Sequence, residues 1–275
     1  MKHITSRDNL FFKELIKLSG SARHRGKANQ TLLDGAHLLA AYLYAGKLPL
    51  HILLNAAALR DDEIAALLER VGVVPITQLD DKLFAELSEL KTPTGIIALI
   101  EIPQPATPVA AACFALLLEN IQDPGNLGSM LRSAAAAGCD AVFLSTGCAD
   151  AWSPRVLRAA MGGHFALRIC EQQDLPDVAK AFCEPPLSGL PAYHSAGMLL
   201  AASLKAKRSL YDCDLSGNIA FLIGNEGAGL SDDLLNLATR QITIPIPGRV
   251  ESLNAAAATA ICLFEAVRQR VESGE

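Results

Sequence analysis

The chain has 275 residues, of which 51% are hydrophobic and 19% are charged, and its formal net charge is −5. This composition supplies enough apolar side chains for a packed core and excludes a largely disordered protein. A chain of this length has room for about two domains of ordinary size. Its apolar stretches fall short of the roughly 18 residues that a membrane-spanning helix needs, so we expect no membrane partner.

The charge is unevenly distributed along the chain. Residues 1–30 hold seven basic and two acidic side chains, so this segment carries +5 and the remainder −10. A local basic segment is typical of contact with nucleic-acid phosphates, but it also fits a solvated helix face, and the charge alone does not decide between the two. The side chains that we expect to contact phosphates are Arg7, Lys13, Arg23, Arg25 and Lys27.

The N-terminal stretch MKHITSRDNL lacks the apolar segment of a signal peptide. Seven cysteines are scattered without a CxxC pair or another metal-ligand spacing, which is typical of reduced thiols in a core. We therefore expect a cytoplasmic protein without a metal site. Among the six histidines, His164 follows two glycines, and we favour a structural role for it over a functional one.

Residues 1–104 are expected to form a small α/β domain. Apolar residues recur at helical spacing after residue 10, and TLLDGAHLLAAYLYAG indicates a strand, a turn and a helix. LHILL and GIIALI are short apolar runs of strand type, with the helical stretch DDEIAALLER between them. The proline-rich stretch IPQPATP, residues 102–108, is interpreted as a linker that divides the chain near residue 105.

Residues 105–275 alternate more sharply between strands and helices, which predicts a mostly parallel sheet with helices on both faces. In the stretch SPRVLRAAMGG, Ser153 is the expected N-cap and Pro154 the first helical residue. The expected strands are the apolar runs at 113–120, 140–145, 197–203, 218–224 and 240–246. The expected helices are 126–138, 153–163, 231–238 and 252–270.

Three loops that follow expected strands carry unusual polar residues, and ligands of open α/β sheets bind outside the carboxyl ends of strands. The first loop, ENIQDPGNLGSMLR, combines turn-forming residues with Asn126, and Arg132 lies further along the helix. A guanidinium at the expected buried end of an alanine-rich helix is costly unless it meets an anion. The position of Arg132 therefore favours a ligand site at this loop over the alternative that the proline, glycine and asparagine residues only shape the turn.

The second loop, LIGNEGAGLS at residues 222–231, holds three glycines around Glu226. It lacks the GxGxxG spacing with which dinucleotide folds bind pyrophosphate, so a nucleotide-dependent oxidoreductase is disfavoured. A carboxylate at this position repels phosphate. We expect a ligand with a positive charge, or with an exposed ribose and adenine.

The third loop, IPIPGRVESLN at residues 244–254, has prolines at alternate positions, which end a central strand. Taken alone, Ser252 is more readily interpreted as the N-cap of the last helix than as a site residue. Three such loops at one edge of a sheet favour a single composite pocket. We therefore expect Ser252 to belong to the pocket, whether or not it also caps the helix.

These three loops resemble the three motifs of the SpoU/TrmH family of RNA ribose 2′-O-methyltransferases, within the SPOUT class. The matching stretches are NIQDPGNLGSMLRSAAAAG, FLIGNEGAGLSDDLL and IPIPGRVESLNAAAATAI, in family order and spacing. The N-terminal ITSRDNLFFKELIKLSGSARHRGKANQTLLDGAHLL is similar to the ribosomal-protein-like RNA-binding domain of many members. Asp34 stands where relatives often have glutamate. The resemblance covers most of the chain and is weakest over residues 171–195.

The resemblance implies a trefoil knot made by the last helix, a homodimer that completes the pocket, and bent S-adenosylmethionine bound by the second and third loops without a metal. The cofactor contacts that it implies are Gly224, Ile244 and Leu253. The catalytic cluster that it implies is Asn126, Arg132, Glu226, Ser252 and Asn254.

The implied reaction is methyl transfer to a ribose 2′-hydroxyl of RNA, with large-subunit (23S) ribosomal RNA favoured over transfer RNA because of the N-terminal domain. Family proposals give Arg132 a part in deprotonation, but a guanidinium rarely gives up its proton. We expect Arg132 to grip a phosphate or the developing alkoxide instead, with Glu226 balancing its charge. The alternatives are a non-catalytic RNA-binding or ribosome-assembly factor on the same fold, and a transfer-RNA ribose methyltransferase.

Overall fold

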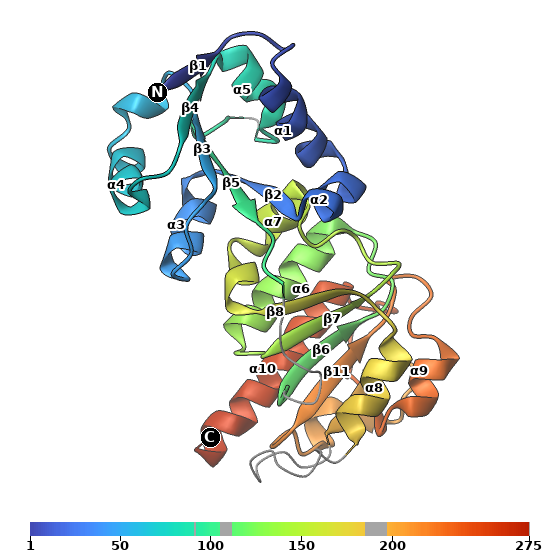
Figure 1. Ribbon diagram of the computed structural model, residues 1–275. Helices are drawn as coiled ribbons and strands as arrows, with labels where there is room; N and C mark the ends of the chain where they lie inside the picture. The colour runs from blue at the N-terminus through green and yellow to red at the C-terminus, as the bar shows by residue number, and fades with distance from the viewer. Residues whose placement is uncertain (91, 105–111, 185–196, 275) are drawn as a thin grey trace. The chain divides into compact units, whose positions relative to one another are not determined.

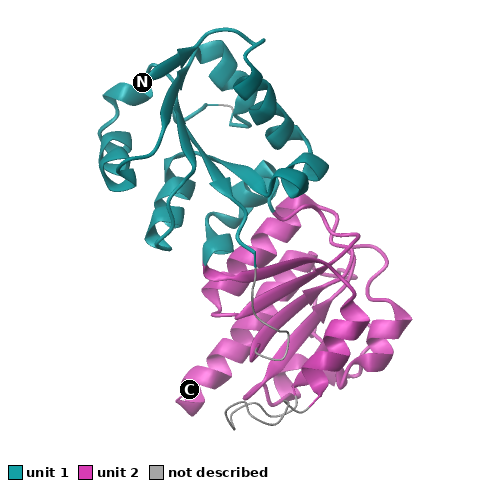
Figure 2. Cartoon of the chain, viewed as in Figure 1, with its two compact units in different colours: residues 1–104, 152–165 teal, residues 105–151, 166–275 magenta. Residues whose placement is uncertain are grey.

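The computed structural model describes residues 1–90, 92–104, 112–184 and 197–274. The chain divides into two compact units, shown in different colours in Figure 2. The first unit comprises Met1–Gln104 and Trp152–Phe165, and the second comprises Pro105–Ala151 and Ala166–Glu275. The sequence prediction assigned all of residues 105–275 to one domain. The segment Trp152–Phe165 instead packs with the first unit, because its apolar side chains find their partners there.

The first unit is built on a five-stranded mixed sheet with the order β1-β4-β3-β5-β2. Strand β5 runs antiparallel to β2 and β3, and the other neighbours are parallel. The strands are β1 (Lys2–Ile4), β2 (Gln30–Asp34), β3 (His51–Leu54), β4 (Ile76–Leu79) and β5 (Ile96–Glu101). The helices are α1 (Leu10–Gly20), α2 (Ala22–Ala28), α3 (Ala36–Tyr44), η1 (Ala58–Arg60), α4 (Asp62–Val71), α5 (Asp81–Leu87), α7 (Pro154–Ala160) and η3 (Gly163–Ala166).

The predicted α/β layer of residues 1–104 is present in this unit. Helix α1 presents Phe12, Leu15 and Leu18 to the sheet, at the helical spacing seen in the sequence, and they join one apolar cluster with Leu53 and Phe84. The sequence analysis did not anticipate β1, β4 or α5, because runs of three to seven residues are too short to show a period. Of the predicted linker 102–108, residues 105–108 lie outside the described residues.

Helix α7 joins the first unit at the edge strand β2. The hydroxyl of Thr31, on β2, donates a hydrogen bond to the carbonyl of Trp152 over 2.7 Å. At the start of α7, the hydroxyl of Ser153 accepts from the amide of Val156, which confirms the predicted cap. His164 is buried, with its ring 5.0 Å from that of Trp152. That packing supports the structural role predicted for His164.

The second unit is a seven-stranded sheet in which all neighbouring strands are parallel, with the order β10-β12-β9-β11-β6-β7-β8. Helices α8 and α9 cover one face and α6 and α10 the other (Figure 1). The strands are β6 (Phe114–Leu118), β7 (Ala141–Ser145), β8 (Arg168–Gln173), β9 (Met198–Ala202), β10 (Arg208–Ser209), β11 (Ile219–Ile223) and β12 (Arg240–Thr243). The helices are α6 (Pro124–Ala136), α8 (Leu175–Cys183), η4 (Leu210–Asp212), α9 (Asp232–Leu237) and α10 (Ala255–Ser273).

This sheet confirms the α/β architecture predicted for residues 105–275, whereas the trefoil knot stays a prediction. The strands β6, β9 and β11 are almost entirely buried apolar runs, as strands of a parallel sheet covered on both faces must be. The closing helix differs from the predicted range 252–270, since it begins at Ala255. Among the described residues, no helix is long and apolar enough to cross a membrane.

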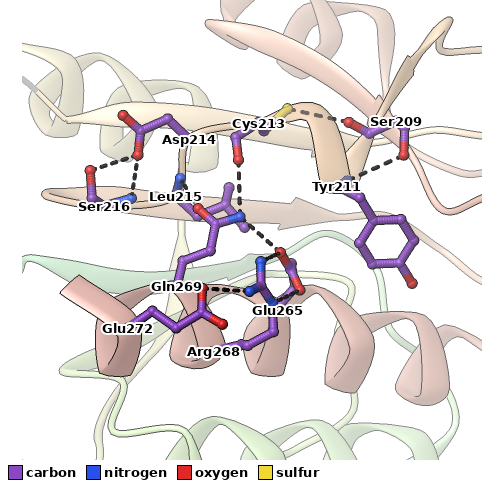
Figure 3. A network of polar contacts seen from close by, with 10 residues as sticks. All are labelled: Ser209, Tyr211, Cys213, Asp214, Leu215, Ser216, Glu265, Arg268, Gln269 and Glu272. Carbon is purple, nitrogen blue, oxygen red and sulfur yellow. Dashed lines mark hydrogen bonds and ion pairs between the residues drawn. The ribbon is translucent and has the colours of Figure 1, made fainter. Parts of the chain in front are cut away.

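Polar contacts fix the C-terminal half of α10 against the segment that follows β10 (Figure 3). The side-chain amide of Gln269 accepts a hydrogen bond from the amide of Leu215 over 2.9 Å and donates to the carbonyl of Cys213 over 3.1 Å. It also donates to Glu265, which Arg268 contacts through two nitrogens. These bonds hold the pKa of Glu265 below its usual value. Gln269 thus joins helix and loop through one side chain.

We predict that Gln269→Leu lowers the free energy of unfolding by about 1–3 kcal/mol, because the amide of Leu215 and the carbonyl of Cys213 lose their partner. Urea denaturation followed by circular dichroism measures the effect. Glu272→Gln is the control, since it breaks only an exposed ion pair with Arg268, which contributes about 0–1 kcal/mol. Equal stability of the two variants would show that Gln269 does not anchor the helix.

Candidate active site

The first two polar loops meet at the carboxyl edge of the parallel sheet. Strands β6 and β11 are neighbours and end in register, with Leu118 opposite Ile223. The amide of Glu119 continues the ladder by donating to the carbonyl of Ile223 over 2.9 Å. Its carboxylate accepts from the amide of Ser231 over 2.7 Å, at the start of α9. The loop after β6 is therefore bonded to both ends of the glycine loop after β11.

Asn225 gives the glycine loop its shape. Its side-chain oxygen accepts from the amides of Gly227 and Ala228 over 3.0 and 2.9 Å. Its backbone pairs in both directions with Gly229, and its side-chain nitrogen donates to the carbonyl of Asn120 over 2.8 Å. The sequence analysis gave Asn225 no role. The signal that could have found it is asparagine placed ahead of a turn, where its oxygen accepts bonds from amides further along the chain.

Gly224 has no room for a side chain. A Cβ atom there would lie 2.2 Å from the carbonyl carbon of Gly229 and 2.3 Å from the amide nitrogen of Leu230. Since backbone atoms cannot move aside cheaply, only glycine allows the two ends of the loop to approach this closely. Gly224 is thus required for the loop itself, and its predicted contact with a cofactor stays a prediction.

Asn126 joins all three loops. Asp123 caps α6 by accepting from the amide of Asn126 over 2.7 Å, which fixes Asn126 in the first turn. The side-chain nitrogen of Asn126 donates to Glu226 over 3.1 Å, and its oxygen accepts from the side chain of Asn254 over 2.9 Å. Three of the five residues expected in the catalytic cluster therefore form one hydrogen-bonded series.

Asn254 reaches Asn126 across the sheet edge. Strand β12, which leads into the third loop, is separated from β11 by β9, so residues 244–254 cross the carboxyl ends of both strands. Asn254 then caps α10, with its side-chain oxygen accepting from the amides of Ala256 and Ala257. Ser252, for which the sequence left a capping role open, does not cap this helix. Asn254 occupies the N-cap position, and its side-chain nitrogen also donates to Asn126.

Glu226 is poised to stay ionised. Partial burial raises the pKa of its carboxyl, but hydrogen bonds from the side chain of Asn126 and from backbone amides, including those of Gln122 and Asp123, outweigh burial and leave the pKa below its usual value. The nitrogen of Asn225 lies 3.5 Å from its second oxygen. A fixed negative charge beside a glycine loop attracts a cationic ligand.

Arg132 and Ser252 are exposed and make no hydrogen bond or ion pair with the described residues of their own chain. The expectation of a buried Arg132 is wrong. It lies six residues after Asn126, about 240° further round the helix, while the core takes the face with Leu127 and Leu131. The expected charge balance between Arg132 and Glu226 is likewise not made within one chain, since Glu226 bonds Asn126.

The predicted phosphate-binding side chains differ in what they contact. Arg25 is 5% exposed and donates to the carbonyls of Leu18 and Ser19, so its assignment to phosphate contact is wrong. Its guanidinium instead satisfies the carbonyls at the end of α1. The other four are exposed at the surface. Arg7 pairs with Glu86 and Lys13 with Asp8, while Arg23 and Lys27 form no ion pair with a carboxylate among the described residues.

Metal and thiol chemistry find no support in the described part of the chain. No group of three or more histidine, cysteine, aspartate or glutamate side chains there is placed to hold a metal ion. None of the described cysteines forms a disulfide bond. Burial raises the pKa of Cys139 and of Cys262 to about 12, so both remain protonated thiols near neutral pH.

A parallel sheet with three polar loops at its carboxyl edge, one of them rich in glycine and next to a carboxylate, defines an α/β enzyme that binds its ligand there. Residues 113–264 match the model of the SpoU rRNA methylase family. The matched range holds all three loops, and it covers more than half of the chain. This protein belongs to that family.

Relatives and solved structures agree with the assignment. The chain is 35% identical over 269 residues to an uncharacterised tRNA/rRNA methyltransferase of Synechocystis, covering 97% of this chain and 94% of the relative. It is 33% identical over 264 residues to the 23S rRNA (guanosine(2553)-2′-O)-methyltransferase RlmP of Bacillus subtilis, covering 96% and 98%. The crystal structure of the AdoMet-bound rRNA methyltransferase from Sinorhizobium meliloti superposes with a TM-score of 0.79 at 27% identity, covering 97% of both chains. The chain is thus an RNA methyltransferase that uses S-adenosylmethionine.

We predict that Asn126→Ala raises the pKa of Glu226, because burial remains while the hydrogen bond from Asn126 is lost. The lowered pKa of the native protein contributes stability that is present above the unfolded value and is lost as the pH falls through the folded value. In the variant this loss begins at a higher pH. Carbon-13 NMR titration of the carboxyl measures the shift, and Ser129→Ala, exposed on the same helix, is the control. An unchanged pKa of Glu226 in the Asn126→Ala variant would show that the hydrogen bond from Asn126 does not control the ionisation of Glu226.

We predict that Asn225→Asp weakens S-adenosylmethionine binding by about tenfold or more, which corresponds to about 1.4 kcal/mol. Aspartate keeps an acceptor for the amides of Gly227 and Ala228, but it opposes the carbonyl of Asn120 and the carboxylate of Glu226. Isothermal titration calorimetry measures the affinity. The control, Asn120→Asp, adds the same charge in the adjacent loop and keeps an acceptor for Ser145. Equal affinities for both variants would contradict the role of Asn225.

Proposed function

We propose that this protein transfers the methyl group of S-adenosylmethionine to a ribose 2′-hydroxyl of 23S ribosomal RNA, and that it acts as a homodimer in the cytoplasm. The observation that carries the proposal is the junction at Asn126, which joins the three family motifs at one sheet edge. The relative from Bacillus subtilis, aligned over nearly the whole of both chains, bears a name that specifies this reaction.

In this proposal the cofactor binds between the glycine loop and the third loop, with contacts to Gly224, Ile244 and Leu253. The residues present fit such a ligand, since Glu226 supplies a negative charge for a sulfonium. The bound cofactor supplies an electrophilic methyl group. The protein's own groups bind and orient it, and Asn225 keeps the loop in shape.

Orientation of the ribose is assigned to the asparagine pair and Ser252. Asn126 and Asn254 are held by each other, by Asp123 and by Glu226, so their positions are fixed before the substrate arrives. Preorganised alignment of nucleophile and methyl donor can lower a barrier by up to about 7–11 kcal/mol. Ser252, two residues before Asn254, is exposed and supplies a hydroxyl.

Arg132 is assigned to the phosphate or the developing alkoxide. Its guanidinium is exposed and has no partner among the described residues of its own chain, so it is free to bind an anion of the substrate or to complete the pocket of a second copy. A guanidinium donates through a planar fork that matches phosphate oxygens, whereas an ammonium is a point charge. This is the physical basis for the proposed homodimer and for the requirement for arginine.

The first unit is assigned to RNA binding. Its exposed basic residues Arg7, Lys13, Arg23 and Lys27 lie in the segment of charge +5. Phosphate contact gives affinity without sequence information, so this unit would hold a structured RNA while the second unit performs the transfer.

The proposed reaction is tested with an unmodified transcript of 23S ribosomal RNA and isotope-labelled S-adenosylmethionine. Nuclease digestion and mass spectrometry should identify a 2′-O-methylated nucleotide. If a transfer-RNA transcript is labelled and the 23S transcript is not, the substrate is transfer RNA rather than ribosomal RNA. Cofactor binding in calorimetry, with no methyl transfer to any RNA, would favour a non-catalytic RNA-binding factor.

We predict that Arg132→Lys lowers kcat by about 100-fold or more and leaves S-adenosylmethionine affinity unchanged, because lysine keeps the charge but loses the fork. Single-turnover methylation and calorimetry measure the two effects. Arg70→Lys, on the exposed side of α4, is the matched control and should keep native turnover. Near-native turnover by a folded Arg132→Lys protein would remove Arg132 from the mechanism.

A further inference from the structure

Helix α7 carries two arginines that no role described above uses. Arg155 and Arg158 are exposed, while Val156, Leu157 and Ala160 are buried. The arginines are three residues apart, so they lie on the same side of the helix. Although α7 follows β7 in the methyltransferase half of the sequence, it belongs to the first compact unit.

Helix α2 carries a second pair of this kind. Arg23 and Lys27 are exposed and four residues apart, while the intervening Arg25 is turned into the unit and bonds the end of α1. Both α2 and α7 contact β2, the edge strand of the five-stranded sheet (Figure 1). We call the exposed residues Arg23, Lys27, Arg155 and Arg158 the β2-edge surface.

The carboxylates near these two helices are bonded to other groups. Glu14, on α1, contacts Lys17 over 2.6 Å and His24 of α2 over 2.9 Å. Helices α2 and α7 contain no aspartate or glutamate. Asp62, Glu63 and Glu69 lie on α4, and that helix connects β3 to β4 at the other side of the sheet. Asp34, at the end of β2, interacts electrostatically with Arg158. Its carboxylate, however, accepts hydrogen bonds from the hydroxyl of Ser88 and the amide of Glu89. The positive charge of the β2-edge surface is therefore not neutralised by an ion pair with Asp34.

Helix stability does not explain Arg23 and Arg155, whereas Lys27 and Arg158 lie in the last turns of their helices, where the helix dipole favours a cation. Arg23 and Arg155 each occupy the second position of their helix, where the partial positive charge of the helix dipole disfavours a cation by about 0.3–1 kcal/mol. Helix α4 has the favourable arrangement, with acidic residues in its first turn and Arg70 in its last. Because Arg23 and Arg155 cost their own helices stability, we expect an external anion to compensate them.

We propose that the β2-edge surface binds consecutive phosphates of the RNA substrate, and that α7 is the part of the methyltransferase half of the chain that contributes to it. The proposal rests on the RNA substrate of the proposed function and adds Arg155 and Arg158 to the contacts. Four guanidinium and ammonium groups on two helices beside one strand form a surface suited to a polyanion backbone, which is read through charge rather than base identity.

The test is the salt dependence of RNA binding by the full chain, with S-adenosylmethionine omitted and an unmodified 23S ribosomal RNA transcript as the probe. The double variant Arg155→Gln/Arg158→Gln should bind at least about tenfold more weakly in low salt. Its slope of log K against log salt should fall by about 1.4–1.8, since each lost phosphate contact removes about 0.7–0.9. The control Arg60→Gln/Arg70→Gln removes the same charge near the acidic helix α4 and should retain the native slope.

A second measurement separates this role from a structural one. Arg155→Gln alone should keep or raise Tm, because it removes a cation that its own helix disfavours, whereas loss of a structural contact would lower Tm. S-adenosylmethionine affinity should stay native in all these variants. A native slope in the α7 double variant, or an equal loss in the control, would overturn the proposal.

The two proposals fail differently. If the α7 variant binds RNA more weakly but the unaltered protein transfers no methyl group, the RNA-binding surface is supported and the proposed catalytic function is contradicted. If the unaltered protein transfers the methyl group but the variant keeps the native slope of log K against log salt, the proposed function is supported and the RNA-binding surface is contradicted.

Discussion

The side chain of Asn126 is the contact on which the candidate site depends. It donates to Glu226 and accepts from Asn254, so it joins loops that follow three different strands. An amide can do this because it carries a donor and an acceptor side by side. Each partner is itself bonded, since Asn254 caps α10 and Glu226 receives further backbone amides. A substitution at Asn126 therefore disturbs the junction of the three loops, the start of the last helix and the charge of Glu226 together.

The rest of the second unit serves to bring these loops into reach. Parallel strands place all their carboxyl ends at one edge, and adjacent β6 and β11 align the first two loops. Helix α10 then runs back over the sheet, where Gln269 fixes its far end to the loop after η4. The helix is thus held at both ends, by Asn254 and by Gln269. Such anchoring keeps the third loop in place without a ligand, which is what a preorganised site requires.

The division of the chain into two units does not follow the order of its sequence. Helix α7 comes from the methyltransferase half but packs with the first unit through β2. If the β2-edge surface binds RNA, the chain itself connects the phosphate-binding unit to the strand β7 that precedes α7. Arg25 and Arg23 show how differently two cations of one helix act, since the first bonds backbone carbonyls inside the unit and the second faces solvent.

The sequence by itself determined the class of fold and the three loops, because apolar periodicity and turn-forming residues act over short distances. It determined the cap at Ser153 for the same reason. The residues that meet at Asn126 were implied by the resemblance to the SpoU/TrmH family, and the tertiary structure brings Glu226 and Asn254 to that side chain. Only the tertiary structure decided that Asn254 rather than Ser252 caps α10, that Arg132 is exposed, that Arg25 is buried, and that α7 joins the first unit. These outcomes depend on contacts between residues far apart in sequence, and a local pattern holds no information about which distant group will meet a given side chain.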